Sequence, residues 1–170
     1  NAVKGMVTQP KFEPTDVVDI ASRVINVLNL QAESADVSLS IEVHGDVLPA
    51  EVDGRQLYNA LYNLVFNAIE ACEGGGSVVV HIRTQPEGEF PEGNYVEIAV
   101  SDTGVGIPPE IKDKLFTEQA VSTKPTGTGL GTRIVANVVE AHGGKIEVES
   151  EQGKGTTITI KLPLRRQKEE

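Results

Sequence analysis

Two asparagines within one apolar helical pattern are the first residues whose spacing could support chemistry. Asn63 and Asn67 stand four positions apart, and Glu70 continues the same row at helical spacing. The row is offset from the leucines of that segment. Carboxamide oxygens are hard donors that suit Mg²⁺, which takes one or two protein oxygens together with water and phosphate. Spacing on its own still favours the simpler interpretation, a solvated helix face with two ordinary asparagines.

A carboxylate followed by two glycines forms the second cluster. Asp102-Thr103-Gly104-Val105-Gly106 comes directly after a stretch of alternating strand pattern. A carboxylate at a strand end is held rigidly and can accept hydrogen bonds from an exocyclic amine. Adenine offers such an amine, whereas guanine has a carbonyl oxygen there and would be repelled. The glycines would let the backbone approach a flat ligand. A plain Asp-Thr-Gly turn explains the same residues equally well.

The third cluster is a glycine-rich segment that opens a helical pattern, formed by Gly127, Thr128, Gly129, Leu130 and Gly131. Glycine-rich backbone at a helix N-terminus offers several N–H groups and the positive end of the helix dipole, which together bind phosphate. No Gly-Lys-Ser/Thr follows and no βαβ repeat surrounds the segment, so it is neither a Walker loop nor a Rossmann fingerprint. A flexible hinge is the alternative.

The elements that must position these clusters follow from the hydrophobic pattern. Apolar residues recur at helical spacing in three segments, 16–28, 53–72 and 132–142. Alternating or β-branched runs predict strands over 38–43, 77–84, 95–101, 145–150 and 156–162. The glycine-punctuated stretch between the third and fourth strands is typical of a lid. Together they predict an α+β fold, a two-layer sandwich with a mixed, mostly antiparallel sheet of about five strands covered on one face by three helices.

Composition narrows the class of protein. The 170 residues suit one domain, and a hydrophobic content of 39% is enough for a core. A net charge of −10 argues against binding to nucleic acid. One cysteine excludes a disulfide framework, and three histidines with that cysteine make no plausible zinc set. No apolar run reaches the roughly 18 residues of a membrane span. We expect a cytoplasmic location, with membrane attachment of the full-length protein left open.

The domain limits can also be predicted. We expect residues 1–13 to be a linker from upstream elements, because this stretch has no sustained period and two prolines follow close together. Residues 14–164 should form the domain, and residues 165–170 a charged tail.

Taken in order, the three clusters resemble the ATP-binding catalytic domain of sensor histidine kinases. This domain has the Bergerat fold, which is shared with DNA gyrase B, Hsp90 and MutL. The resemblance runs from about residue 13 to residue 163. Residues 63–68 are similar to the N box, 102–108 to the G1 box and 127–131 to the G2 box, and residues 140–146 and 155–157 also match kinases of this type.

This resemblance implies ATP and Mg²⁺ as ligands. Asn67 would coordinate Mg²⁺ and Asn63 would line the phosphate site, so these two asparagines are the implied catalytic residues. Asp102 would bind the adenine amino group, with Gly104 and Gly106 close to the ring. The other implied ATP-binding residues are Lys124 in the ATP lid, Gly127, Thr128, Gly129, Leu130 and Gly131 at the phosphates, and Thr157 near adenine.

The reaction implied by the resemblance is transfer of the ATP γ-phosphate to a histidine of a separate dimerisation domain. His44, His81 and His142 lack the Glu/Asp and Pro that surround a phosphoacceptor. The acceptor is therefore expected upstream in the same protein, with a response regulator downstream and the isolated domain monomeric.

Three departures from the family pattern keep other functions open. Glu70 stands where many members carry a basic residue, the F box at 115–121 has a single Phe and no Pro, and Thr132 stands where leucine is common. These features motivate a non-catalytic nucleotide-sensing module as one alternative. A Bergerat-fold ATPase is another, but it would need a carboxylate four residues before the metal asparagine. This chain has Asn63 there, which is a poor general base.

Overall fold

The structure, a computed structural model, describes residues 9–72, 74–85, 94–107 and 130–165; for Leu130 and Gly131 it describes the backbone alone. The helices are α1 (Val17–Ser34), α2 (Gly54–Ala71) and α4 (Leu130–Ala141). The strands are β1 (Glu13–Thr15), β2 (Val37–His44), β3 (Ala50–Val52), β4 (Gly76–Gln85), β5 (Tyr95–Asp102), β6 (Lys145–Glu151) and β7 (Gly155–Pro163). None of the helices described is long and apolar enough to cross a lipid bilayer.

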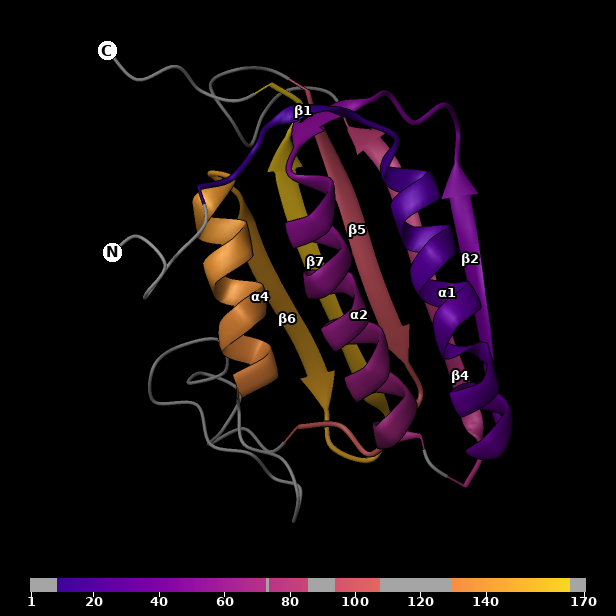
Figure 1. Ribbon diagram of the computed structural model, residues 1–170. Helices are drawn as coiled ribbons and strands as arrows, with labels where there is room; N and C mark the ends of the chain where they lie inside the picture. The colour runs from indigo at the N-terminus through magenta and orange to yellow at the C-terminus, as the bar shows by residue number, and fades with distance from the viewer. Residues whose placement is uncertain (1–8, 73, 86–93, 108–129, 166–170) are drawn as a thin grey trace, which may run out of the picture.

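One mixed sheet carries the fold, with strand order β2-β4-β5-β7-β6. The pair β2–β4 is parallel, and the other three pairs are antiparallel. All three described helices lie on one face of this sheet (Figure 1), with α2 between α1 and α4. The predicted two-layer α+β sandwich is confirmed. The short antiparallel pair β1–β3, a second sheet of three paired positions, has no counterpart in the sequence prediction.

Two aspartates begin the first two helices where the sequence predicts them. The side chain of Asp16 accepts hydrogen bonds from the N–H groups of Val18 at 3.0 Å and Asp19 at 3.2 Å. Oδ1 of Asp53 accepts from the N–H of Gln56 at 3.0 Å. Such caps satisfy N–H groups that have no partner inside the helix. The apolar stripes then pack on the sheet, and the largest fully buried helix residues are Leu28, Leu57, Leu61 and Leu64.

Strand alternation divides the sheet into a covered face and an open face. In β4, β5 and β7 the even-numbered residues face the helices, as the buried Val80, Ile98 and Ile160 illustrate. The odd-numbered residues face away from the helices. They include the polar side chains His81, Arg83, Glu97, Thr159 and Lys161. This division decides which side chains at the strand ends can meet α2.

Part of the segment predicted as a linker contacts the domain. The N–H of Lys11 donates to Oδ2 of Asp53 at 2.8 Å. The ring of Phe12 packs edge-on against His142, with 4.9 Å between ring centroids. Glu13 pairs with Val52 in the β1–β3 sheet. These contacts hold residues 11–13 against the end of β3, the start of α2 and the end of α4, and the predicted boundary at residue 14 stays a prediction.

Candidate functional site

The asparagine row of α2 continues to the end of that helix. Asn63, Asn67 and Ala71 follow one another at intervals of four, so they lie along one side of α2. Both asparagines are half-buried. Nδ2 of Asn63 donates to the backbone carbonyl of Asn59 at 2.8 Å, which holds this amide nitrogen against the helix. Asn67 lies about 6 Å along the axis from Ala71 at 1.5 Å per residue.

The end of this row meets the segment that follows β5. The carbonyl of Ala71 accepts from the N–H of Val105 at 3.2 Å. Gly104 packs so closely on the Ala71 backbone that a Cβ at this glycine would overlap the Ala71 carbonyl. The end of α2 and the segment after β5, over thirty residues apart in the sequence, are therefore in direct contact.

Asp102 is held by its own turn at the last position of β5. Its Oδ1 accepts from the N–H of Gly104 at 2.8 Å, while Thr103 donates its N–H to the carbonyl of Ser77 at 3.1 Å. Oγ1 of Thr103 accepts from the N–H of Ser77 at 3.0 Å. These bonds tie the turn to the start of β4. The carboxylate of Asp102 is half-buried on the covered side of the sheet.

The two glycines of this segment pack closely against the backbone of other segments. Gly106 has φ +80°, a left-handed conformation, and a Cβ there would overlap the Glu151 carbonyl. The N–H of Gly153 also donates to the carbonyl of Val105 at 2.7 Å. Gly104 and Gly106 thus allow close packing of backbone on backbone. A side chain at either position would overlap protein backbone, and the predicted closeness of these glycines to a flat ligand stays a prediction.

Thr156, which the sequence analysis missed, lies opposite Asp102 in place of Thr157. The β5–β7 register pairs Asp102 with Thr156 and Ser101 with Thr157. Thr157 shares a hydrogen bond with Ser101, Oγ to Oγ1 at 2.9 Å, on the open face. The predicted place of Thr157 near adenine stays a prediction; the residue on the same side of the sheet as Asp102 is Thr156. The alternation of Ile158, Ile160 and Leu162 was the signal that could have identified it.

Ser150 joins Thr156 to the segment after β5. Its Oγ lies 2.9 Å from Oγ1 of Thr156 and accepts from the N–H of Ile107 at 2.8 Å. Thr156 is buried, with 7% of its surface exposed. A hollow of about 550 Å³ opens at this end of the sheet, lined by Asp102, Thr103, Thr156 and residues of the β6–β7 turn. The site therefore combines the end of α2, the end of β5 and the start of β7.

The predicted phosphate-binding residues fall at the limit of what the structure describes. Lys124, Gly127, Thr128 and Gly129, and the F box at 115–121, lie outside the described residues. α4 begins at Leu130, and Gly131 belongs to its first turn. This end of α4 lies at the same end of the molecule as the last residues of α2 and β5 (Figure 1). The partial positive charge of the α4 dipole is thus on the side of Asp102 and Ala71.

His142 has a structural role at the opposite end of the helix layer. Its Nε2 accepts from the N–H of Asp53 at 3.0 Å, and its Nδ1 lies 2.7 Å from the carbonyl of Val138. An imidazole can fill both places only when Nδ1 carries the proton and Nε2 does not. His142 thus forms a buried link from the end of α4 to the start of α2.

The carboxyl of Asp53, at the start of α2 and next to His142, has a pKa shifted from its ordinary value. Burial opposes ionisation of its carboxyl, but the N–H groups of Lys11, Gln56 and Arg55 donate to it. These hydrogen bonds outweigh the burial and hold the pKa of Asp53 below the ordinary value of 3.8. The charge stabilises the start of α2 and is distant from the Asp102 end.

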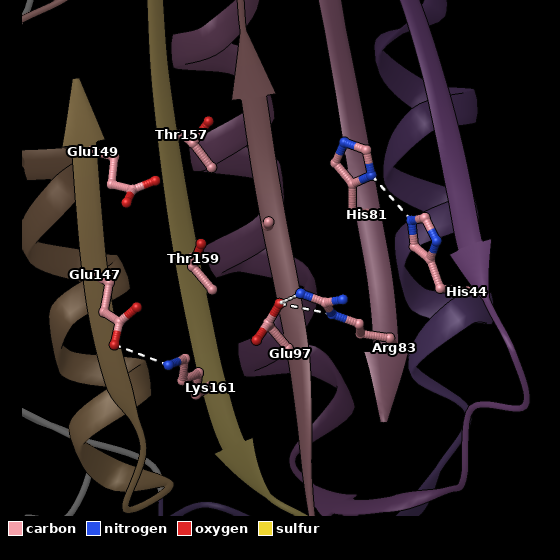
Figure 2. Close-up of a pocket in the computed structure, with 10 residues that line it drawn as sticks. His44, His81, Arg83, Glu97, Glu147, Glu149, Thr157, Thr159 and Lys161 are labelled. Carbon is pink, nitrogen blue, oxygen red and sulfur yellow. Dashed lines mark hydrogen bonds and ion pairs between the residues drawn. The ribbon is translucent and has the colours of Figure 1, made fainter. Parts of the chain in front are cut away.

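The open face carries a second hollow, of about 480 Å³, lined by His44, His81, Arg83, Glu97 and Lys161 among others (Figure 2). His44 and His81 lie side by side there, whereas the sequence analysis treated them as scattered. This hollow is on the other side of the sheet from the asparagines and belongs to a separate feature.

Comparison with known proteins agrees with this geometry. The sequence profile of the family described as "Histidine kinase-, DNA gyrase B-, and HSP90-like ATPase" matches residues 52–166. Sporulation kinase E of Bacillus subtilis is 35% identical over 159 residues, which are 94% of this chain. Those residues are 21% of the relative, so the chain spans about a fifth of its length.

Two solved structures have a similar fold. The catalytic domain of histidine kinase ThkA superposes with a TM-score of 0.77 at 26% identity, covering 91% of this chain and 96% of that domain. Full-length ShkA, crystallised with AMPPNP, gives a TM-score of 0.79 at 23% identity, covering 97% of this chain and 34% of ShkA.

Proposed function

Because this chain belongs to the histidine kinase-, DNA gyrase B- and HSP90-like ATPase family, we propose that it is the ATP-binding catalytic domain of a sensor histidine kinase. The observation that carries the proposal is the contact between Ala71 and the segment of Gly104 and Val105. That contact joins the asparagine row of α2 to the carboxylate at the end of β5. A nucleotide could then lie across both, base at one end and phosphates at the other.

In this proposal the adenine amino group donates to the carboxylate of Asp102. The turn bond to Gly104 fixes the carboxylate before the base arrives, so little ordering remains to be done on binding. Thr156, buried and opposite Asp102, would border the same end of the base. AMPPNP in the structure of ShkA, which shares this fold, supports an adenine nucleotide as ligand.

The residues at hand also fit Mg²⁺. Asn67 offers a carboxamide oxygen on the side of α2 that leads to Asp102, and such hard oxygen donors are those Mg²⁺ prefers. Asn63, one turn earlier, would line the phosphates. When bound with ATP, the metal neutralises charge on the phosphoryl group that is transferred. The proposed phosphate ligands on the protein are Lys124 and the backbone of Gly127, Thr128, Gly129, Leu130 and Gly131 at the start of α4.

The proposed reaction transfers the γ-phosphoryl group to a histidine on a dimerisation domain of the same protein. An unprotonated imidazole nitrogen forms the P–N bond, the bond from phosphorus to the bridging oxygen breaks, and ADP leaves with the electron pair. Such a nitrogen has a lone pair ready, so no side chain must remove a proton first. The transfer therefore needs the reactants to be positioned but needs no general base. Asn63 fits this requirement, because it stands where an ATPase would need a carboxylate.

The wider assignments belong to the same proposal. A response regulator would receive the phosphoryl group, the isolated domain would be a monomer, and ATP as donor fits a cytoplasmic location. Nucleic acid is not a proposed partner, since the chain carries a net charge of −10.

Calorimetric titration of the 170-residue chain with AMPPNP tests the binding step. We expect micromolar to submillimolar affinity, stronger with Mg²⁺ than without, and much weaker binding of the matching GTP analogue. Equal affinity for both nucleotides would contradict the role of Asp102. No binding at all would contradict the nucleotide site itself.

The transfer step needs an acceptor. The chain is joined behind a histidine-bearing dimerisation segment and incubated with ATP labelled at the γ-phosphate. Label that is lost in acid and kept in base indicates phosphohistidine. Release of inorganic phosphate without labelled protein would favour the ATPase alternative. Binding without either product would favour the nucleotide-sensing module.

A further inference from the structure

Three ligating side chains converge on the open face of the sheet, at its β2 edge. Glu42 and His44 are two residues apart on β2 and so point to the same face. His81 of β4 is the register partner of Glu42 in the parallel pair. One ligand atom from each of the three lies within 4.8 Å of the others, and no other such group of three occurs in the part of the chain that the structure describes.

The distances between these atoms match the spacing of ligands around one metal ion. Nε2 of His44 and Nδ1 of His81 are 3.2 Å apart (Figure 2). Oε1 of Glu42 lies 3.5 Å from Nδ1 of His81 and 3.9 Å from Nε2 of His44. Tetrahedral ligands bound to zinc at 2.0–2.1 Å are about 3.3–3.4 Å apart. All three side chains are at least 36% exposed, so a small rotation of Glu42 closes the remaining gap.

The two described cations that line the same hollow, Arg83 and Lys161, are paired with other carboxylates. Arg83, the next open-face residue of β4, donates from Nε at 3.0 Å and from Nη2 at 2.9 Å to Oε2 of Glu97. This pair turns the guanidinium toward β5 and away from β2 (Figure 2). Lys161 is held farther along the sheet by Glu147 at 2.9 Å.

A hydrogen bond between the two imidazoles is the simpler explanation of the 3.2 Å contact. It needs only the two rings, one donating and one accepting. It does not account for a carboxylate that approaches both of the same nitrogens. A metal ion uses all three atoms, because each of them then presents a lone pair to one point.

We propose that Glu42, His44 and His81 form a binding site for a divalent transition metal, zinc, on the open face. Imidazole nitrogens select such metals over Mg²⁺, so the site is chemically distinct from the proposed nucleotide site. Three protein ligands leave a fourth position for water or for a ligand from another molecule. The ion would fasten the edge strand β2 to β4. Parallel strand pairs are slightly less stable per residue than antiparallel ones, so a bound ion would stabilise the pairing of β2 with β4.

Calorimetric titration of the 170-residue chain with Zn²⁺, without nucleotide or Mg²⁺, tests the proposal. We expect one site of micromolar or tighter affinity and a rise in Tm. His44→Gln and His81→Gln should each lower the affinity at least tenfold, since loss even of indirect metal partners costs about 10–100-fold. Glu42→Gln should lower it less. Glu149→Gln, an exposed carboxylate elsewhere on the open face, is the matched control and should bind Zn²⁺ as the parent does.

One further readout separates this site from general attraction of cations to an acidic protein. Cobalt as a probe should give the intense visible bands of tetrahedral coordination. Unchanged affinity in the double variant His44→Gln/His81→Gln, no binding at millimolar Zn²⁺, or equal binding of Mg²⁺ would each overturn the proposal.

Discussion

Asp102 and Thr156 lie directly opposite each other across the β5–β7 pair, while their neighbours Ser101 and Thr157 bond to each other on the other face of the sheet. Adjacent threonines thus belong to two different surfaces. Thr156 is linked through Ser150 to the segment that carries Gly106, and Thr157 is linked only across the open face. This register places the two threonines on opposite faces of the sheet, so we expect only Thr156 to affect nucleotide binding.

Replacing each threonine by valine tests that separation. Thr156→Val should weaken AMPPNP binding and lower the free energy of unfolding by about 1 kcal/mol, because the buried hydroxyl bond to Ser150 is lost. Thr157→Val is the matched control and should leave AMPPNP affinity unchanged, with a smaller loss of stability. Calorimetry and urea unfolding measure the two quantities. Weaker binding in Thr157→Val with normal binding in Thr156→Val would reverse the assignment.

The helices that cover the sheet could be predicted from the sequence, because the patterns that mark a helix involve only neighbouring residues. The caps Asp16 and Asp53 and the leucine stripe of α2 each depend on a few neighbouring residues. The strand predicted over 156–162 already included Thr156, but its alternation was not used to decide which threonine faces the helices. The β1–β3 sheet could not be predicted, since three-residue strands such as Glu13–Thr15 leave no periodic signal.

A carboxamide at position 102 tests recognition of the base. In Asp102→Asn the carboxamide oxygen can still accept from the N–H of Gly104, so the turn and the melting temperature should persist. Its NH₂ group cannot accept from the adenine amine, and loss of a bond to a charged group costs about 2 kcal/mol, roughly thirtyfold in affinity. The same NH₂ could donate to the guanine carbonyl. Competition between AMPPNP and its GTP analogue should therefore show reduced adenine preference. Asp46→Asn, in an exposed loop, is the control.

The order of the motifs predicts a site, but the contacts within it could not be predicted. Nothing local in the sequence says that Gly104 packs on Ala71, because that contact joins two segments through the whole fold. The two histidines of the open face show the same limit of sequence analysis more clearly. His44 and His81 are 37 positions apart and meet only because β2 pairs with β4 in parallel register. The sequence analysis considered only histidines and the cysteine as zinc ligands, so it did not include Glu42.

The metal role of Asn67 can be separated from nucleotide binding as a whole. Asn67→Ala should remove the gain in AMPPNP affinity that Mg²⁺ gives and leave the Mg²⁺-free affinity nearly unchanged. The reason is that Mg²⁺ would lose a protein oxygen while the base contacts remain. Titrations with and without Mg²⁺ measure the difference. Asn26→Ala, on the exposed side of α1, controls for loss of a surface amide. An undiminished Mg²⁺ effect in Asn67→Ala would remove this residue from the metal site.

Stability in acid should depend on Asp53, whose pKa is held below its ordinary value by backbone N–H donors despite burial. A carboxyl with a lowered pKa in the folded state stabilises the fold above its unfolded pKa, and that contribution is lost as pH falls through the folded pKa. Asp53→Asn keeps the cap on Gln56 but cannot accept from both Gln56 and Lys11. The variant should be less stable than the parent by about 1 kcal/mol at neutral pH.

The difference in stability between parent and variant should disappear in acid, once the pH has fallen below the folded-state pKa of Asp53 and the parent carboxyl is also protonated. Urea unfolding at a series of pH values measures it. Asp36→Asn, exposed beyond the end of α1, is the control for a general change in charge. A gap that stays constant down to the lowest pH would mean that the Asp53 charge does not stabilise the start of α2. Nucleotide affinity should not change, because Asp53 lies at the opposite end of α2 from Ala71 and the Asp102 turn.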